Sequence, residues 1–400
     1  MPLLFASPGK LCQRLRLMTI VLILNAGLAL HAAPRTPVSD AEVLEHLPMR
    51  PGDSIARELG LLRVALAASP ASPDAASALA QRYFDLAMAR GDPRYVGYAD
   101  AVLVNFEPRM TSDLLLVRGQ LRQYRHQFEG ALEDFAGALQ RNADLAQAHA
   151  WRGAIFLVQA RYPEAQQACT ALKTMGRVAL ANACQGLLQA YSGQLLAAQA
   201  SLQQALQGNP DPESQLWLLT RLGEVASWRG QGSLAEGYFK KALGLGLDDG
   251  YLLAAWSDYL LDAGRPAEVV KLLSNWEASD GLLLRLAEAE TQLKLPLAAK
   301  HTQAIADRFA AAALRGDVTH RAEQARFELR LRANPNESLA LAQANYQVQR
   351  EPRDARVLLE AAVAARQPGR AQAALDWLRS SGFEDPRLRA LAQTLAKDTP

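Results

Sequence analysis

Histidine is the side chain best suited to acid–base and metal chemistry near neutral pH, so its spacing is informative. The chain has six: His31, His46, His126, His149, His301 and His320. None belongs to an H-E-x-x-H pattern, and none is spaced as a metal pair. The sequence also has no Gly-rich phosphate loop, nucleophile elbow or C-x-x-C motif. We therefore expect no catalytic residue, no metal site and no cofactor.

Carboxylate pairs could supply a general acid and a general base. Glu288 with Glu290, and Glu133 with Asp134, are such pairs. Their type and spacing are typical of charged residues on any helical surface, so we expect the chain not to be an enzyme. The alternative is a helical enzyme that acts on a cell-envelope polymer. Such an enzyme would need a separate catalytic domain, for which the chain leaves no room.

The residues from Ser112 to Leu145 predict two short helices packed against each other. Apolar residues recur along the second helix with a 3.6-residue period, which gives one apolar stripe. These residues are Phe128, Ala131, Leu132, Phe135, Ala138 and Leu139. Gly119 lies in the first helix, where the lack of a side chain allows close approach. A hairpin of this kind cannot bury both of its faces alone.

The same pattern returns 34 residues later, because Gly153, Tyr162 and Ala165 repeat Gly119, Phe128 and Ala131. Later copies carry Gly186, Gly193, Ala198, Ala205 and Pro210, then Gly223, Gly230, Ala235, Phe239 and Ala242. Period and residues together resemble the tetratricopeptide repeat family. This resemblance implies an all-α fold, a right-handed α-α superhelix of helical hairpins. Half of the residues are apolar and only 6% are aromatic, a composition that favours helices over strands.

The copies divide the chain into segments. Residues 111–309 form the repeat array, and residues 70–110 a degenerate first repeat. Residues 34–69 are a lead-in with a capping helix, for which Asp53 or Ser54 is a suitable N-cap. Residues 310–400 are degenerate C-terminal repeats that end in a capping helix. Arg326 and Arg330 belong to a basic run there, which is either a basic patch or, with Glu323 and Glu328 interleaved, a solvated helix face with ion pairs.

Residues 1–33 have the layout of a secretory signal peptide. Lys10, Arg14 and Arg16 precede the apolar run Leu17–Leu30, and small residues at 32 and 33 suit cleavage. We expect a periplasmic or secreted bacterial protein, with an uncleaved anchor as the alternative. No later stretch could span a membrane. Cleavage leaves 40 of the 43 basic residues against 41 acidic ones, so charge gives no case for nucleic-acid binding.

Two cysteines remain after the signal, and the repeat alignment places them in neighbouring helices. Cys169 lies in the second helix of one repeat, and Cys184 in the first helix of the next. Both are about seven residues from the turn between them, so an antiparallel pair would bring them to the same height. An oxidising compartment would allow a disulfide. Two buried free thiols are the alternative, because Cys packs as a small hydrophobe.

The resemblance also implies a binding site, because the first helix of each tetratricopeptide repeat lines a concave groove. Carried over to this chain, the inward positions are Gln120, Tyr124, Leu187, Tyr191, Trp217, Glu224, Trp228, Tyr251 and Asp258. Tyr124, Tyr191 and Trp228 share one repeat position and could form an aromatic column, or could pack between repeats. Members that bind a C-terminal carboxylate use Lys and Asn where this chain has Leu116 and Gln120, so that specificity is not expected.

We thus expect an exported scaffold that binds a protein or peptide partner in its groove, as an assembly or accessory factor of the bacterial periplasm. A structural subunit of an envelope complex is a further alternative to the enzyme.

Overall fold

The structure is a computed structural model that describes residues 39, 53–107 and 109–397. The expected signal peptide, residues 1–33, lies outside the described residues. Within these residues the regular elements are α-helices and the short 3-10 segments η1 (Val104–Phe106) and η2 (Pro368–Ala371). The chain divides into Met1–Ala56 and Arg57–Pro400, and the second unit holds all the long-range contacts described below.

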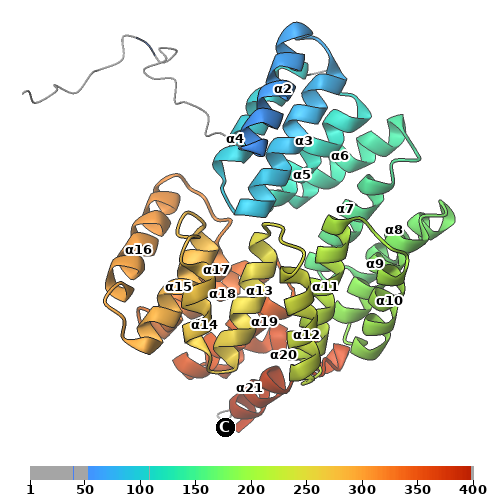
Figure 1. Cartoon of the computed structure of the whole chain (residues 1–400). Coiled ribbons are helices and arrows are strands. Elements are labelled where there is room, and N and C mark those ends of the chain that lie inside the picture. The colour runs from blue at the N-terminus through green and yellow to red at the C-terminus, as the bar shows by residue number, and fades with distance from the viewer. Residues whose placement is uncertain (1–38, 40–52, 108, 398–400) are drawn as a thin grey trace, which may run out of the picture. The chain divides into compact units, whose positions relative to one another are not determined.

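The helices follow one another as pairs along the chain (Figure 1). The first half comprises α2 (Ser54–Ala68), α3 (Pro73–Arg90), α4 (Arg94–Leu103), α5 (Ser112–Tyr124), α6 (Phe128–Arg141), α7 (Ala146–Val158), α8 (Tyr162–Thr174), α9 (Val178–Tyr191), α10 (Leu195–Gln207) and α11 (Pro212–Trp228). The second half comprises α12 (Gly232–Leu243), α13 (Gly250–Asp262), α14 (Pro266–Leu273), α15 (Asp280–Leu293), α16 (Ala298–Leu314), α17 (Arg321–Arg330), α18 (Pro335–Tyr346), α19 (Pro352–Ala365), α20 (Gln372–Ser381) and α21 (Pro386–Lys397).

Close packing within each pair follows the predicted small and large positions. A Cβ added to Gly119 would lie 2.5 Å from Phe135 Cε1, and one added to Gly223 would lie 2.8 Å from Phe239 Cε1. The second helix of four successive pairs contributes an alanine that is fully buried: Ala131, Ala165, Ala198 and Ala235. The absence of bulk therefore lets the helix backbones approach. These contacts confirm the all-α fold of tetratricopeptide-type hairpins.

The turn inside each hairpin needs one residue with a left-handed backbone. Gly193, Gly230 and Gly264 supply it with φ of 87°, 70° and 68°, which glycine adopts without steric cost. His126 and Ala160 occupy the equivalent turns with φ of 58° and 57°. At His126 this conformation carries the imidazole past the end of α5.

The lead-in helix begins at the predicted cap, where Asp53 Oδ1 accepts a hydrogen bond from the Ala56 amide at 2.8 Å. Farther along α2, Arg63 Nε donates to the Tyr83 hydroxyl of α3 at 2.8 Å. Leu59 is buried, whereas Leu61 keeps 73% of its surface exposed. The helix is thus attached to the first repeat mainly by one side.

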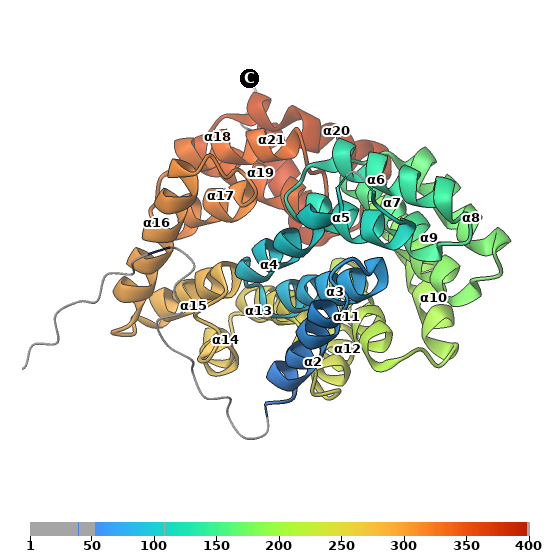
Figure 2. The same cartoon turned by 90° about the horizontal axis from the view of Figure 1, so that it is seen from above.

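The C-terminal helices fold back onto the earlier repeats, and Figure 2 shows the chain turning from α15 through α16 into α17 and α18. Trp377 Nε1 of α20 donates to the Tyr162 hydroxyl of α8 at 2.9 Å. The Arg350 amide, just before α19, donates to the Val158 carbonyl of α7 at 2.7 Å. A single apolar core joins α9–α11 to α18–α21. It includes four side chains with no exposed surface: Leu202, Leu222, Leu359 and Phe383.

Helix α3 of the first repeat also meets α13, far along the chain. A Cβ on Gly250, at the start of α13, would lie 3.5 Å from the Ala89 carbonyl of α3. A Cβ on Gly91 would lie 2.5 Å from the Oγ atom of Ser279, just before α15. The inner faces of α5, α13, α15, α17 and α19 are thereby brought around one enclosed space.

Candidate functional site

The two cysteines form a disulfide that ties α8 to α9. The Cα atoms of Cys169 and Cys184 are 5.4 Å apart, and 15 positions separate them in the chain. The expected bond is therefore present, and the free-thiol alternative is not. Closing a loop of this length stabilises the folded chain by about 3 kcal/mol in the chain-entropy model. The bond joins two adjacent repeats.

Part of the predicted groove is covered by the chain's own C-terminal helices. The Tyr191 hydroxyl donates to Glu351 Oε1 at 2.7 Å, and Tyr191 is 3% exposed. The Trp228 ring lies 5.4 Å from the Phe383 ring, centroid to centroid. Leu187 packs at the edge of the same apolar core. In this structure these three side chains serve internal packing.

A second part of the groove forms a polar cluster. The Tyr251 hydroxyl donates to Glu224 Oε1 at 2.7 Å, and Arg221 pairs with Glu224 Oε2 at 2.9 Å. The Arg221 guanidinium lies 4.0 Å above the centre of the Tyr251 ring and 5.4 Å from that of Trp217. Burial raises the pKa of Tyr251, so its phenol keeps the proton that it donates. Gln120 lies apart from this cluster, 3% exposed, and its Oε1 has no hydrogen-bond partner among the described residues.

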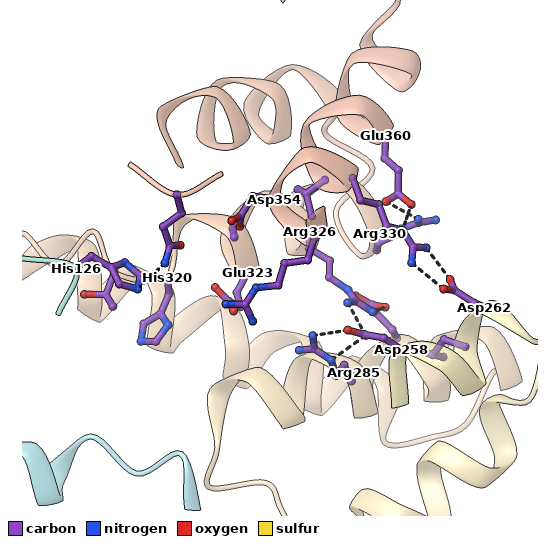
Figure 3. Close-up of a pocket in the computed structure, with 18 of the residues that line it drawn as sticks. His126, Asp258, Asp262, Arg285, His320, Glu323, Arg326, Arg330, Asp354 and Glu360 are labelled. Carbon is purple, nitrogen blue, oxygen red and sulfur yellow. Dashed lines mark hydrogen bonds and ion pairs between the residues drawn. The ribbon is translucent and has the colours of Figure 1, made fainter. Parts of the chain in front are cut away.

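The remaining two groove residues, Tyr124 and Asp258, line a cavity of about 560 Å³ on the inner side of the array (Figure 3). Its walls come from the ends of α3 and α5, from α13, α15 and α17, and from α19. A cavity of this size suits a small ligand or a short stretch of polypeptide. Its lining is mostly charged or polar, with five arginines and six carboxyl groups.

One end of the cavity is a network of ion pairs. Asp258 accepts from Arg285 Nη2 at 2.7 Å and from Arg326 Nη1 at 2.6 Å, and Arg326 also pairs with Glu288 at 2.6 Å. Burial opposes ionisation of Asp258, but the two guanidiniums hold its pKa well below its usual range. Arg356 bridges Asp262 and Glu360 at 2.6 and 2.8 Å. The network therefore crosslinks α13, α15, α17 and α19.

The other end of the cavity holds polar groups with fewer partners. Figure 3 shows His126, His320 and Glu323 on this side, opposite Asp262 and Glu360. Gln349 Nε2 lies 2.9 Å from His126 Nε2, and burial lowers the pKa of His126 to about 4, so its ring is neutral. Burial raises the pKa of Tyr124 to about 12. Burial also disfavours ionised Glu323, but His320 and nearby arginines hold its pKa below the usual range.

Several charged residues lie elsewhere than the sequence indicated. Glu288 and Glu290, expected on a solvated surface, are 6% and 2% exposed, and Glu290 pairs with His301 Nδ1 at 2.7 Å. Asp134 is 3% exposed and pairs with Arg118 at 2.6 Å. The surface prediction was wrong for these residues, because each carboxylate is bonded to a side chain of another helix.

The basic run in α17 was also misassigned. Arg326 is paired with Asp258 and Glu288, and Arg330 with Glu360 at 2.7 Å, so the partners lie on other helices rather than on α17 itself. The available signal was the spacing of residues 323, 326 and 330, which places them on one helix face. That face borders the cavity.

The described residues contain no group of His, Cys, Asp and Glu side chains that could hold a metal ion. None of their helices combines the length and apolar character needed to cross a membrane. What the cavity offers is hydrogen bonding and charge.

No protein-family model and no curated protein matches the chain. Solved structures with a similar fold include a tetratricopeptide repeat protein from Parabacteroides merdae, with 14% identity and a TM-score of 0.42, over 58% of this chain and 91% of that one. The Cut9–Hcn1 hetero-tetramer of APC/C has 17% identity and a TM-score of 0.40, over 85% and 52%. Yeast Tom70 has 15% identity and a TM-score of 0.36, over 85% and 62%. The chain thus spans less than two thirds of the last two, and likenesses at this level add nothing to the assignment of the site.

Proposed function

We propose that this chain is an exported, non-enzymatic scaffold of the bacterial periplasm, and that a segment of a partner polypeptide enters the cavity lined by Tyr124 and Asp258. The observation that carries the proposal is the cavity itself. Two of the predicted groove residues, Tyr124 and Asp258, line its wall, and α17 and α19 close it from the other side without filling it.

Export is supported by the signal-like layout of residues 1–33 and by the Cys169–Cys184 disulfide, because such bonds persist in oxidising compartments. The role as an assembly or accessory factor follows from the absence of a recognisable reactive motif in a chain built of binding-type repeats.

Asp354 is the group in the cavity that most resembles a catalytic acid, since burial raises its pKa to about 7. Its oxygens are occupied, however. They accept hydrogen bonds from Asn345 Nδ2 and from the Glu351 amide, both at 3.0 Å, in a capping box at the start of α19. This is a structural arrangement, and it favours binding over catalysis.

A photo-crosslinking amino acid placed at Gln292 tests the proposal, because Gln292 is an exposed residue of the cavity lining. The matched control position is Glu129, an exposed residue of α6 outside the cavity. After irradiation of intact cells and purification from the periplasm, we expect one or two protein adducts from position 292 that are missing from position 129. The same adducts from both positions, or none from position 292, would refute the proposal.

A further inference from the structure

The two ends of the cavity differ in how many of their polar groups have a hydrogen-bond or ion-pair partner. At the ion-paired end, Arg326 uses Nε, Nη1 and Nη2 in bonds of 2.6 to 2.8 Å. Arg285 likewise directs Nε and Nη2 to Asp258 and Nη1 to the Gly281 carbonyl, at 2.7 to 2.9 Å. An anionic ligand could reach these guanidiniums only by displacing carboxylates that already neutralise them.

The opposite end has one ionised group without a counter-charge in contact. Within the described part of the chain, Glu323 forms no side-chain hydrogen bond or ion pair with another residue, and neither do the Tyr124 hydroxyl and the His320 ring. Arg353, the nearest guanidinium of α19, is committed to Glu351 at 2.6 Å. A carboxylate held this way in a recess is stabilised by a cation that the ligand brings.

We propose that the end of the cavity bounded by Tyr124, His320 and Glu323 binds the ammonium or guanidinium group of a lysine or arginine side chain. The Glu323 carboxylate pairs with the cation, and the Tyr124 hydroxyl accepts one of its remaining N–H groups. The inference rests on the proposed function in one respect, namely that the cation belongs to the partner polypeptide.

The geometry disfavours the opposite choice of ligand. A peptide carboxylate would face Glu323 and would find each cavity arginine already paired. The inward residues Leu116 and Gln120 offer no cation either, and both are buried, at 4% and 3% exposure. Charge therefore selects basic over acidic segments.

Calorimetric titration of the mature protein with blocked tripeptides tests this specificity. The probes are acetyl-Gly-Lys-Gly-amide, its norleucine analogue, which has the same chain without the charge, and its glutamate analogue. We expect the lysine peptide to bind at least about tenfold more tightly than either analogue. Equal affinities, tighter binding of the glutamate peptide, or no binding of the lysine peptide would overturn the inference.

Variants locate the effect. Glu323→Gln keeps the shape of the side chain and should abolish the preference for lysine, and Tyr124→Phe should reduce it several-fold. Glu129→Gln, which removes an exposed carboxylate on α6, should leave it unchanged. A preference that survives Glu323→Gln in a protein of unchanged circular dichroism would refute the assignment. Cadaverine is a free diamine. If it bound as tightly as the lysine peptide, the site would take free amines, and the assignment of the cation to a partner polypeptide would be wrong.

The two proposals fail in different ways. If position 292 still crosslinks a partner in the Glu323→Gln variant at full yield, the scaffold function stands and the cation inference is wrong. If the lysine peptide binds through Glu323 but position 292 yields no adduct, the cation site stands and the scaffold function is wrong.

Discussion

Tyr191 and Glu351 lie 160 positions apart in the chain, yet the Tyr191 hydroxyl donates to Glu351 Oε1 at 2.7 Å in the interior. Burial disfavours the ionised carboxylate, and Arg353 and this hydroxyl hold the pKa of Glu351 below its usual range. The bond therefore fastens the start of α19 to the end of α9. It is one of the contacts that hold the C-terminal helices on the inner face of the array.

Removing this hydroxyl should loosen that attachment. Tyr191→Phe leaves the ring in place and deprives a buried carboxylate of one donor, so we expect the free energy of unfolding to fall by about 1–3 kcal/mol. Urea denaturation followed by circular dichroism measures it. Tyr98→Phe is the matched control, because Tyr98 is 50% exposed and its hydroxyl has no bond among the described residues. Equal losses in both variants would contradict the role given to the bond.

Two glycines in neighbouring helices should respond to alanine with opposite signs. A Cβ at Gly223 of α11 would lie 2.8 Å from the Phe239 ring, so we expect Gly223→Ala to cost about 1–3 kcal/mol of stability. A Cβ at Gly237 of α12 would meet no atom within 4 Å, so Gly237→Ala should gain about 0.5–1 kcal/mol from helix propensity. Denaturant midpoints of the two variants check the difference, and a stabilised Gly223→Ala would count against the close packing.

These glycines show what the sequence can predict. Gly119 and Gly223 recur in phase with buried alanines, and that local, periodic pattern is enough for the hairpins and for the Cys169–Cys184 pair. The 34-residue period does not encode where the array folds back on itself, because that depends on the small rotation added at each repeat. The contact between Trp228 and Phe383 could therefore not be predicted from the sequence, since Phe383 follows a degenerate repeat.

The cavity was missed for a related reason. Arg326 and Glu288 are 38 positions apart and look, each on its own helix, like ordinary surface charges. Only the folded arrangement makes them partners. The predicted groove positions did include Tyr124 and Asp258, because the resemblance marks inward-facing residues even where it does not say what will cover them.

The disulfide should contribute a measurable part of the stability. Replacing both Cys169 and Cys184 with alanine should lower the free energy of unfolding by about 3 kcal/mol, which is the stabilisation expected from closing a loop of this length. Urea denaturation without reductant measures the loss. Dithiothreitol should destabilise the wild-type protein to a similar extent and leave the double variant unaffected. A wild-type protein that is indifferent to reductant would show that the bond does not form in solution.

His126 should make stability depend on pH. Burial lowers the pKa of His126 to about 4, against about 6.5 in the unfolded chain, so below pH 6.5 the unfolded state binds a proton that the folded state does not. This group therefore destabilises the fold as pH falls, by about 2 kcal/mol between pH 7.5 and 5. The asparagine variant His126→Asn suits the left-handed backbone, with φ of 58°, and should lack the effect.

The comparison must be made between the two proteins at each pH, because Asp354 acts in the opposite direction. Burial raises the pKa of Asp354 to about 7, so its contribution to stability is lost as pH rises through that range. Asp354 is present in both proteins, so its contribution to stability cancels in the difference between them. We expect the stability advantage of wild type over His126→Asn to shrink by about 2 kcal/mol from pH 7.5 to pH 5, and a constant advantage would contradict a buried neutral imidazole.

Tyr124 and Trp228 share one repeat position but should differ in role. Tyr124 lines the cavity and forms no side-chain hydrogen bond within the described residues, so Tyr124→Ala should reduce crosslinking at position 292 with little loss of stability. Trp228 packs 5.4 Å from Phe383 and 6.4 Å from Tyr191, so Trp228→Ala should cost about 3 kcal/mol of stability. Thermal unfolding and crosslinking yield, measured on both variants, separate the roles. If Trp228→Ala lost the partner and kept its melting temperature, the partner would bind along the aromatic column instead, and the C-terminal helices would have to leave the groove to admit it.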